Sequence, residues 1–227
     1  MKKIMSFLII FLGIFHLNAT FSDECSFTKD YQLVDKLKSN RVRVIVMRHV
    51  ESNNNTKKII TCARTPGFCV TPRGFMQIND LLPVFSEQKI YKIFASSLYR
   101  CMQSTQLLGE KLDIPINNLV VEDRLNVQKF GPYERYPYTV YNNLFPSLTA
   151  MLETDLEGVE SGAKVFKRTN AFLWHLANNL FDKTVLVITH AFNCCYISKC
   201  LTNDYGALPH PGEYVIYDFP EEHECSW

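Results

Sequence analysis

The chain has 227 residues, of which 47% are hydrophobic and 21% are charged, and its formal net charge at pH 7 is +1. This near balance of charge, without a block of basic residues, argues against a nucleic-acid-binding protein. A chain of this size and composition can bury the core of one compact domain.

The N-terminal segment resembles a secretory signal. Two lysines precede an almost wholly apolar run, residues 4–17, and small or polar residues follow it. This arrangement is typical of a signal peptide, and the run is shorter than the roughly 20 residues of a membrane-spanning helix. We expect residues 1–22, approximately, to be removed, with an uncleaved anchor as the alternative. The mature domain, residues 23–227, is then secreted or in the lumen of the secretory pathway, and not in a membrane.

The chain contains eight cysteines, an even number that is compatible with disulfides in an exported protein. Cys62 and Cys69 flank a short Pro-Gly loop, and Cys25 and Cys225 lie near opposite ends of the chain. The spacing does not decide between these and other pairings. The sequence has no CxxC pair, and the scattered spacing argues against a zinc site.

Short apolar runs alternate with segments whose apolar residues recur at helical spacing, which predicts an α/β fold. After a lead-in to residue 40, the expected strands are residues 42–47, 90–95, 119–121, 184–190 and 214–219. The expected helices begin at Thr71-Pro72, where Thr71 can cap, and at residues 99–111, 165–181 and 191–201.

Two further features of this order bear on the site. Ser96 or Ser97 can cap the helix that starts at Tyr99. Residues 123–146 form a long irregular segment rich in aromatic side chains, which favours an ordered lid or pocket wall over disorder.

Basic side chains follow three of the predicted strands. Arg48 and His49 follow the first, Arg100 lies in the first turn after the second, and His190 ends a later one. In an open sheet of parallel strands these ends meet at one edge, where ligands bind. Two guanidinium groups can hold the oxygens of a phosphate by paired hydrogen bonds, and a neutral histidine can attack phosphorus. A second, protonated histidine would stabilise the transferring group, so the scheme needs neither a metal ion nor another cofactor.

The motifs around these residues resemble those of the histidine phosphatase superfamily, in its phosphoglycerate-mutase-like branch. Arg48-His49-Val50-Glu51-Ser52 is similar to the family's Arg-His-Gly-Glu-Ser signature, and Asn55 stands where the family has a phosphate-contacting Asn. The other matching blocks are Val70–Gly74 with Gln77, Ser96–Thr105, Glu160-Ser161 with Arg168, and Val187–His190.

This resemblance implies a three-layer α/β/α sandwich around a largely parallel sheet. It also implies a nucleophilic His49 and a phosphate pocket made by Arg48, Asn55, Arg100 and His190.

The sequence departs from the family pattern at three places. Val50 and Ala191 each replace a glycine, and Val127 stands where the family has its proton-donating Glu. Losing a positioned general acid typically costs about 10²- to 10⁴-fold in rate. The leading replacement is Glu134, because its Gly-Pro-Tyr context can bend back toward the pocket. Glu122 and Asp123 are the alternatives.

These observations predict a secreted phosphomonoester hydrolase that acts through a phosphohistidine intermediate on His49. Its substrate would be a small-molecule or protein phosphomonoester. The alternative, which Val127 supports, is a catalytically weak or inactive relative that binds phosphorylated ligands or a protein partner. A phosphoglycerate mutase proper is the third reading, and export together with the missing acid argues against it.

Overall fold

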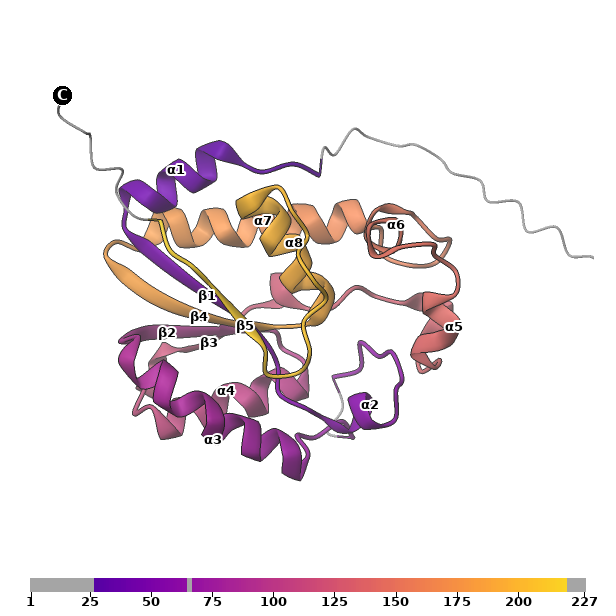
Figure 1. Cartoon of the computed structure of the whole chain (residues 1–227), viewed down its shortest axis with the longest axis horizontal. Helices are drawn as coiled ribbons and strands as arrows, with labels where there is room; N and C mark the ends of the chain where they lie inside the picture. The colour runs from indigo at the N-terminus through magenta and orange to yellow at the C-terminus, as the bar shows by residue number, and fades with distance from the viewer. Residues whose placement is uncertain (1–26, 65–66, 220–227) are drawn as a thin grey trace, which may run out of the picture.

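The computed structural model describes residues 27–64 and 67–219, whose strands form one five-stranded sheet with the order β3-β2-β4-β1-β5 (Figure 1). The strands are β1 (Val42–Arg48), β2 (Ile90–Ala95), β3 (Leu119–Val121), β4 (Lys183–Thr189) and β5 (Tyr214–Tyr217). The pairs β1·β4, β4·β2 and β2·β3 are parallel, and only the edge strand β5 is antiparallel. The prediction of a largely parallel sheet is confirmed.

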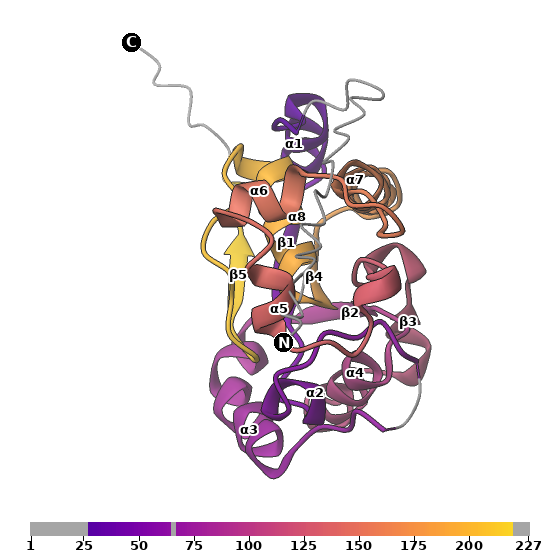
Figure 2. The same cartoon turned by 90° about the vertical axis from the view of Figure 1, so that its right-hand side faces the viewer.

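Helices cover both faces of this sheet, which confirms the three-layer α/β/α arrangement. In Figures 1 and 2 the helices α1, α7 and α8 lie on one face, and α3 and α4 lie on the other. The helices are α1 (Tyr31–Ser39), α2 (Asn53–Thr56), α3 (Pro72–Glu87), α4 (Tyr99–Lys111), α5 (Tyr138–Asn142), α6 (Leu148–Glu153), α7 (Gly162–Asn179) and α8 (Ala191–Thr202), with 3₁₀ turns at Ile116–Asn118, Asp123–Leu125 and Gly131–Tyr133.

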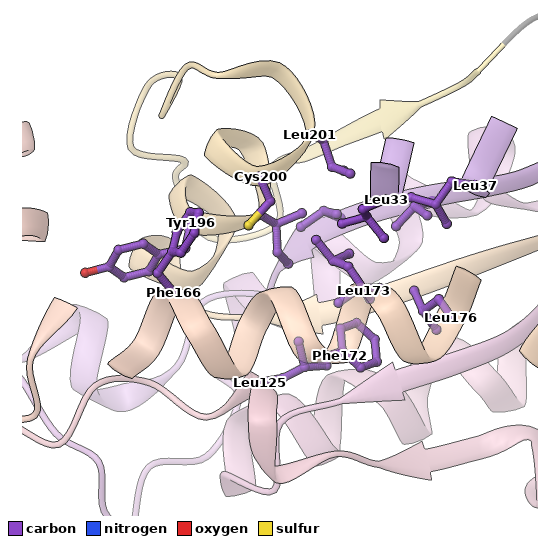
Figure 3. Close-up of a cluster of buried hydrophobic side chains, with 14 of the residues drawn as sticks. Leu33, Leu37, Leu125, Phe166, Phe172, Leu173, Leu176, Tyr196, Cys200 and Leu201 are labelled. Carbon is purple, nitrogen blue, oxygen red and sulfur yellow. The ribbon is translucent and has the colours of Figure 1, made fainter. Parts of the chain in front are cut away.

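The central strands are apolar because they are buried on both faces. Alternate residues of β1 point to opposite sides, so Val44 and Val46 join the core under α1, α7 and α8, whereas Ile45 and Met47 join the core over α3 and α4. Figure 3 shows the first of these cores, where Leu33 from α1 meets Leu173 from α7.

Of the two helix caps predicted from the sequence, one is present in the structure and the other is not. Thr71 caps α3, since its side chain accepts a hydrogen bond from the amide of Gly74. The predicted cap of α4 by Ser96 or Ser97 is wrong, because the N-cap residue is Leu98 and no side chain caps it. The hydroxyl groups of both serines instead bond to the amide oxygen of Asn126.

Backbone hydrogen bonds continue past the ends of the strands and align the residues that follow them. The register pairs Arg48 with Thr189, and the amide of His49 donates to the carbonyl of Thr189 over 2.9 Å. The amide of Ser96 donates to the carbonyl of Ile188 over 3.1 Å. The carboxyl ends of β1, β2 and β4 therefore lie side by side.

The irregular segment, residues 123–146, is ordered around a third and smaller apolar core. This core contains Ile60, Leu98, Val127, Phe130, Tyr141 and Met151. The rings of Phe130 and Tyr141 meet edge to face, with centroids 5.3 Å apart. The segment thereby forms a wall beside the carboxyl edge of the sheet.

The predicted signal, and also Cys25 and Cys225, fall outside the described residues. A disulfide between Cys62 and Cys69, one of the pairings that the sequence left open, is not formed, because Cys62 has a free thiol that donates to Glu134 over 3.2 Å. No helix within residues 27–64 and 67–219 is long and apolar enough to cross a membrane.

Candidate active site

A cavity of about 220 Å³ opens at the carboxyl edge of the sheet, where β1, β2 and β4 end. It is lined by Arg48, His49, Asn54, Ile59, Ile60, Thr61, Arg100, Val127, Phe130, Tyr138, Asn142, His190, Ala191, Phe192 and Leu208. The topology has therefore brought together the two arginines and two histidines that the sequence singled out.

His49 is 2% exposed and has a hydrogen-bond partner at each ring nitrogen. Its Nδ1 lies 2.8 Å from the carbonyl oxygen of Val50, so that nitrogen carries the proton and donates. Nε2 is then unprotonated and accepts from Nε of Arg100 over 3.1 Å. This tautomer is assigned from the network, and it directs the lone pair of Nε2 toward the arginine.

Arg100 connects the two histidines to the neighbouring loop. Besides its bond to His49, one terminal nitrogen of its guanidinium donates to the carbonyl of Thr61 and to Nδ1 of His190, each over 3.1 Å. The rings of His49 and His190 lie 5.3 Å apart between centroids. One guanidinium therefore sets the spacing of both rings.

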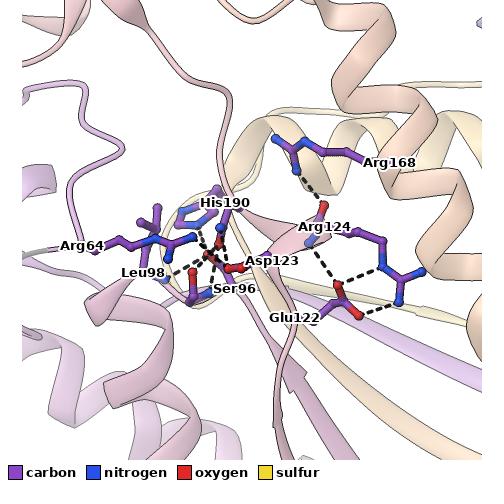
Figure 4. A network of polar contacts seen from close by, with 10 residues as sticks. Arg64, Ser96, Leu98, Glu122, Asp123, Arg124, Arg168 and His190 are labelled. Carbon is purple, nitrogen blue, oxygen red and sulfur yellow. Dashed lines mark hydrogen bonds and ion pairs between the residues drawn. The ribbon is translucent and has the colours of Figure 1, made fainter.

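His190 is held from its other side by a polar network that extends away from the cavity (Figure 4). Because Nδ1 accepts from Arg100, Nε2 carries the proton and donates to Oγ of Ser96 over 2.8 Å. Ser96 donates in turn to Oδ1 of Asn126 over 2.7 Å, and the amide nitrogen of Asn126 donates to Asp123 over 3.0 Å. This network fixes the tautomer and the plane of the ring.

The electrostatic environment keeps both rings neutral. Burial lowers the pKa of His49 well below its usual value, and the charges of Arg100 and Arg48 lower it further. Burial, followed by the charges of Arg100, His49 and Arg48, lowers the pKa of His190 in the same way. A neutral His49 suits nucleophilic attack. In the ligand-free protein, burial and the charges of the two arginines favour a neutral His190 as well. Its protonation with a phosphoryl group bound stays a prediction.

The two arginines each retain a buried donor without a partner in the described part of the chain. These donors are Nε of Arg48 and one terminal nitrogen of Arg100. A terminal nitrogen of the Arg48 guanidinium donates to the carbonyl of Pro209 over 2.7 Å, which fixes the Arg48 side chain. A buried donor left unpaired costs about 1–3 kcal/mol, and more when it is charged. An anion in the cavity would relieve this cost at both residues.

Asn55, the predicted phosphate contact, does not line this cavity. Its oxygen accepts hydrogen bonds from the backbone and hydroxyl of Ser52, over 3.0 and 2.9 Å, which closes a capping box at the start of α2. Its amide nitrogen donates to the hydroxyl of Tyr138 over 3.2 Å. The neighbouring Asn54 lines the cavity instead. A direct contact of Asn55 with phosphate stays a prediction.

Val127 lines the cavity and is 7% exposed, so an apolar side chain occupies the part of the wall where the resemblance implies an acid. The three carboxyl candidates all lie outside the lining. Glu134 accepts from the hydroxyl of Thr61 and, over 2.9 Å, from the amide of Cys62. It thereby holds the loop whose carbonyl binds Arg100. A role for Glu134 as proton donor stays a prediction.

Glu122 and Asp123 are both committed to other partners. Figure 4 shows Glu122 turned toward Arg124, to which it bonds over 2.9 and 2.6 Å. Although burial raises the pKa of Glu122, the hydrogen bonds from Arg124 lower it overall. Hydrogen bonds from Ser97 and Asn126 lower the pKa of Asp123. Both carboxyl groups are therefore ionised near neutral pH and hold no proton to donate.

Several residues of the site carried no clear signal in the sequence. Thr61 and Asn54 come from a loop and a short helix whose path depends on tertiary contacts, whereas Tyr138 belongs to the aromatic segment predicted as a lid or pocket wall. The sequence pattern predicts Ser96 as a helix cap and Asn126 as part of an irregular segment, and it does not indicate their bonds to His190 and to each other. Among the described residues, no group of three His, Cys, Asp or Glu side chains is arranged to hold a metal ion.

Comparison with known protein families identifies the chain. The model of the histidine phosphatase superfamily, branch 1, matches residues 44–211. The chain belongs to this superfamily. The match includes both predicted histidines and both arginines, so the resemblance inferred from the motifs is confirmed. No curated protein matches the chain in sequence.

Solved structures share the fold of this histidine phosphatase. A putative alpha-ribazole-5′-P phosphatase from Escherichia coli superposes with a TM-score of 0.64 at 18% identity, over 80% of this chain and 92% of the other. A mycobacterial glucosyl-3-phosphoglycerate phosphatase, in complex with VO3, gives a TM-score of 0.61 at 18% identity, over 77% and 90% of the two chains. Superfamily membership and these neighbours indicate phosphatase or phosphoryl-transfer activity.

Proposed function

We propose that this protein is a phosphomonoester hydrolase that forms a covalent phosphohistidine on Nε2 of His49. In the first step the lone pair of Nε2 attacks phosphorus and the ester oxygen leaves. In the second step water attacks phosphorus and releases phosphate from His49. The neutral ring, whose Nδ1–H is bonded to the carbonyl of Val50, is ready for the first step.

One observation carries this proposal: two arginine donors, on Arg48 and Arg100, lie buried and unpaired beside a neutral histidine. Charged guanidinium groups bind phosphate oxygens by short hydrogen bonds. A phosphoryl group bound there would draw Arg100 off Nε2 of His49 and so free the nucleophile. The charge of a bound phosphate also favours a protonated His190, which would then stabilise the transferring group.

The experiment that tests this proposal is chemical trapping of the intermediate. Full-length protein is mixed with 4-nitrophenyl [³²P]phosphate, quenched in alkali and digested. We expect an acid-labile label on the peptide that contains His49, and no label or turnover in His49→Ala. His175→Ala is the matched control, because His175 lies on α7 outside the cavity and should leave both unchanged.

The same experiment separates an enzyme from a binding protein. Val127 in the cavity wall favours the second candidate, a catalytically weak relative that retains phosphate affinity. Phosphate binding without label or turnover would support that candidate and overturn the hydrolase. Label on any residue other than His49 would overturn the mechanism.

We also infer export of the protein, and disulfides among its cysteines, from the N-terminal sequence and the even number of cysteines. The substrate is then a phosphomonoester, on a small molecule or on a protein, that occurs outside the cytosol. The structural neighbours described as glucosyl-3-phosphoglycerate and alpha-ribazole-5′-P phosphatases are compatible with a small-molecule ester.

A further inference from the structure

We propose that Tyr138 is the proton donor to the leaving group. This inference rests on the proposed function. The leaving group needs a proton donor, and Val127 replaces the carboxyl that the family uses for this step. Glu134, Glu122 and Asp123 all lie outside the cavity lining.

Among the side chains that line the cavity, one is a candidate for the proton donor. Among its lining side chains, arginines hold their protons too tightly and His49 is the nucleophile. His190 is assigned to the transferring phosphoryl group, and its Nε2–H is bonded to Ser96. The hydroxyl of Thr61 already donates to Glu134. Tyr138 is the remaining lining residue with an ionisable O–H, since the other polar side chains in the lining are those of Asn54 and Asn142.

The backbone holds Tyr138 in place at the start of α5. Its amide donates to the carbonyl of Lys58 over 2.8 Å, and the preceding Pro137 pairs with Ile59 in an isolated bridge. The ring lies between the reaction cavity and a wider cleft of about 770 Å³, and it lines both. A leaving group that extends from the cavity into the cleft would pass this hydroxyl.

The hydrogen bonds of Tyr138 leave its proton available. The side-chain amides of Asn54 and Asn55 donate to the phenolic oxygen over 3.3 and 3.2 Å. Two donors on the oxygen direct the O–H away from α2, and no acceptor in the described part of the chain takes its proton. The structure thereby gives Asn55 a function in positioning Tyr138.

The same surroundings suit the phenolate that forms when the proton leaves. The two amide donors strengthen their bonds to a negative oxygen. Arg48 and Arg100 both lie close enough for their charges to interact with a phenolate at Tyr138. This arrangement is the one expected for a group that gives up a proton in one step and regains it in the next.

The proton balance is as follows. Nε2 of His49 forms the bond to phosphorus while the P–O ester bond breaks, and the leaving oxygen takes the proton of Tyr138 to become an alcohol or phenol. Water then attacks phosphorus and gives one proton to the Tyr138 phenolate, while the P–N bond breaks and its electron pair returns to His49. Phosphate leaves, and both side chains are restored.

The test is the leaving-group dependence of Tyr138→Phe, with a series that runs from 4-nitrophenyl phosphate through phenyl phosphate to an alkyl phosphate. A general acid matters most when the leaving group is a strong base. We expect kcat/KM for the alkyl ester to fall about 10²-fold or more, and that for the 4-nitrophenyl ester to change by less than about threefold. Tyr141→Phe is the matched control, because its hydroxyl bonds to Gln128 behind the wall. It should behave like the wild type.

A pH profile adds a readout that a purely structural role would not move. Fluorine makes a phenol more acidic, so 3-fluorotyrosine at position 138 should shift the alkaline limb of alkyl ester turnover to lower pH. Phosphate binding by Tyr138→Phe, measured by titration, should match that of the wild type within a few fold.

The outcomes are distinguishable. An equal loss for all esters, or no loss, in Tyr138→Phe would overturn the role of Tyr138 while the active wild type still supports the hydrolase. If kcat/KM depends steeply on the leaving-group pKa in Glu134→Gln, and Tyr138→Phe behaves like the wild type, then Glu134 is the proton donor instead. A wild type that hydrolyses no ester at all would overturn the proposed function and this inference with it.

Discussion

Arg100 has two functions that a single substitution can separate. In the ligand-free protein its guanidinium bonds to His49, His190 and Thr61, and one of its nitrogens stays unpaired for a ligand. Its charge also lowers the pKa of both histidines. Binding and the acidity of the nucleophile therefore depend on the same side chain.

We expect Arg100→Ala to weaken inhibition by phosphate or vanadate by about 10²-fold, since a charge-assisted hydrogen bond contributes roughly 1.5–3 kcal/mol. The acid limb of kcat/KM should also move to higher pH, because burial and Arg48 still lower the pKa of His49 but the repulsion from Arg100 is gone. Arg100→Lys should recover the position of the acid limb more fully than the affinity, since an ammonium group cannot replace the planar fork. Inhibition constants and pH profiles of the three proteins measure both effects, and unchanged inhibition in Arg100→Ala would remove Arg100 from the phosphate site.

At the level of single residues, the sequence located the groups that follow strands. Arg48, His49 and His190 are fixed by the ends of β1 and β4, and their positions follow from the periodicity of apolar residues alone. The sequence placed Tyr138 in an aromatic pocket wall without indicating its role, and it gave no signal for Thr61, because both depend on contacts between segments far apart in the chain. The role of Asn55 as a ligand of phosphate stays a prediction, and its capping box with Ser52 is a local function that the motif match does not indicate.

At the level of elements, the start of α3 packs against the loop that follows His49. A Cβ atom at Gly74 would lie 2.4 Å from the carbonyl oxygen of Glu51 and 2.7 Å from a methyl carbon of Val70. The contact with Glu51 is to backbone, which cannot rotate away. Val50, which replaces the family's glycine, adds a third contact at 3.2 Å.

Gly74→Ala should therefore destabilise the protein by about 1–3 kcal/mol, the usual cost of overpacking, despite the better helix propensity of alanine, worth about 1 kcal/mol. It should also slow turnover, because the displaced loop carries the backbone next to His49. Gly67→Ala is the control, since no atom lies within 4 Å of its added methyl group. Chemical denaturation and kcat measure the two effects, and equal stability of the two variants would show that the loop yields at no cost.

The boundaries of the regular elements were largely predictable, because strands such as β2 (Ile90–Ala95) and helices such as α4 (Tyr99–Lys111) have clear periodicity. The start of α4 at Leu98, without a side-chain cap, was not predictable in this way. The serines that would normally cap α4 are taken up by Asn126 and His190, a competition that appears only once β3 and β4 are placed beside β2.

For the whole molecule, the two buried histidines link the free energy of unfolding to pH. In the folded protein their pKa values lie well below the usual 6.5, whereas the unfolded chain takes up protons near that pH. The unfolded state thus binds more protons below pH 6.5, and the stability of the folded state must fall as the pH falls.

We expect the free energy of unfolding to decrease between pH 6.5 and 5 with a slope of up to about 1.4 kcal/mol per pH unit for each histidine. Carboxyl groups with lowered pKa values, such as Glu122, act in the same direction but mainly below this window. Urea titrations at several pH values measure the slope. The double variant His49→Gln and His190→Gln should flatten it, and an unchanged slope would mean that other groups take up the protons.

The pairing of β1 with β4 has a further consequence for how such enzymes change over evolution. The two strands that precede the histidines are paired along their whole length, in parallel register from Val42 with Lys183 to Arg48 with Thr189. The wall that faces the leaving group comes from a separate stretch, between β3 and α7. Exchange of that stretch in recombination would alter which alcohol is released and would replace Tyr138 and Asn126 with it, while the strands that carry the nucleophile stay in place. New substrates are then reached by replacing one loop, while the nucleophile is inherited unchanged.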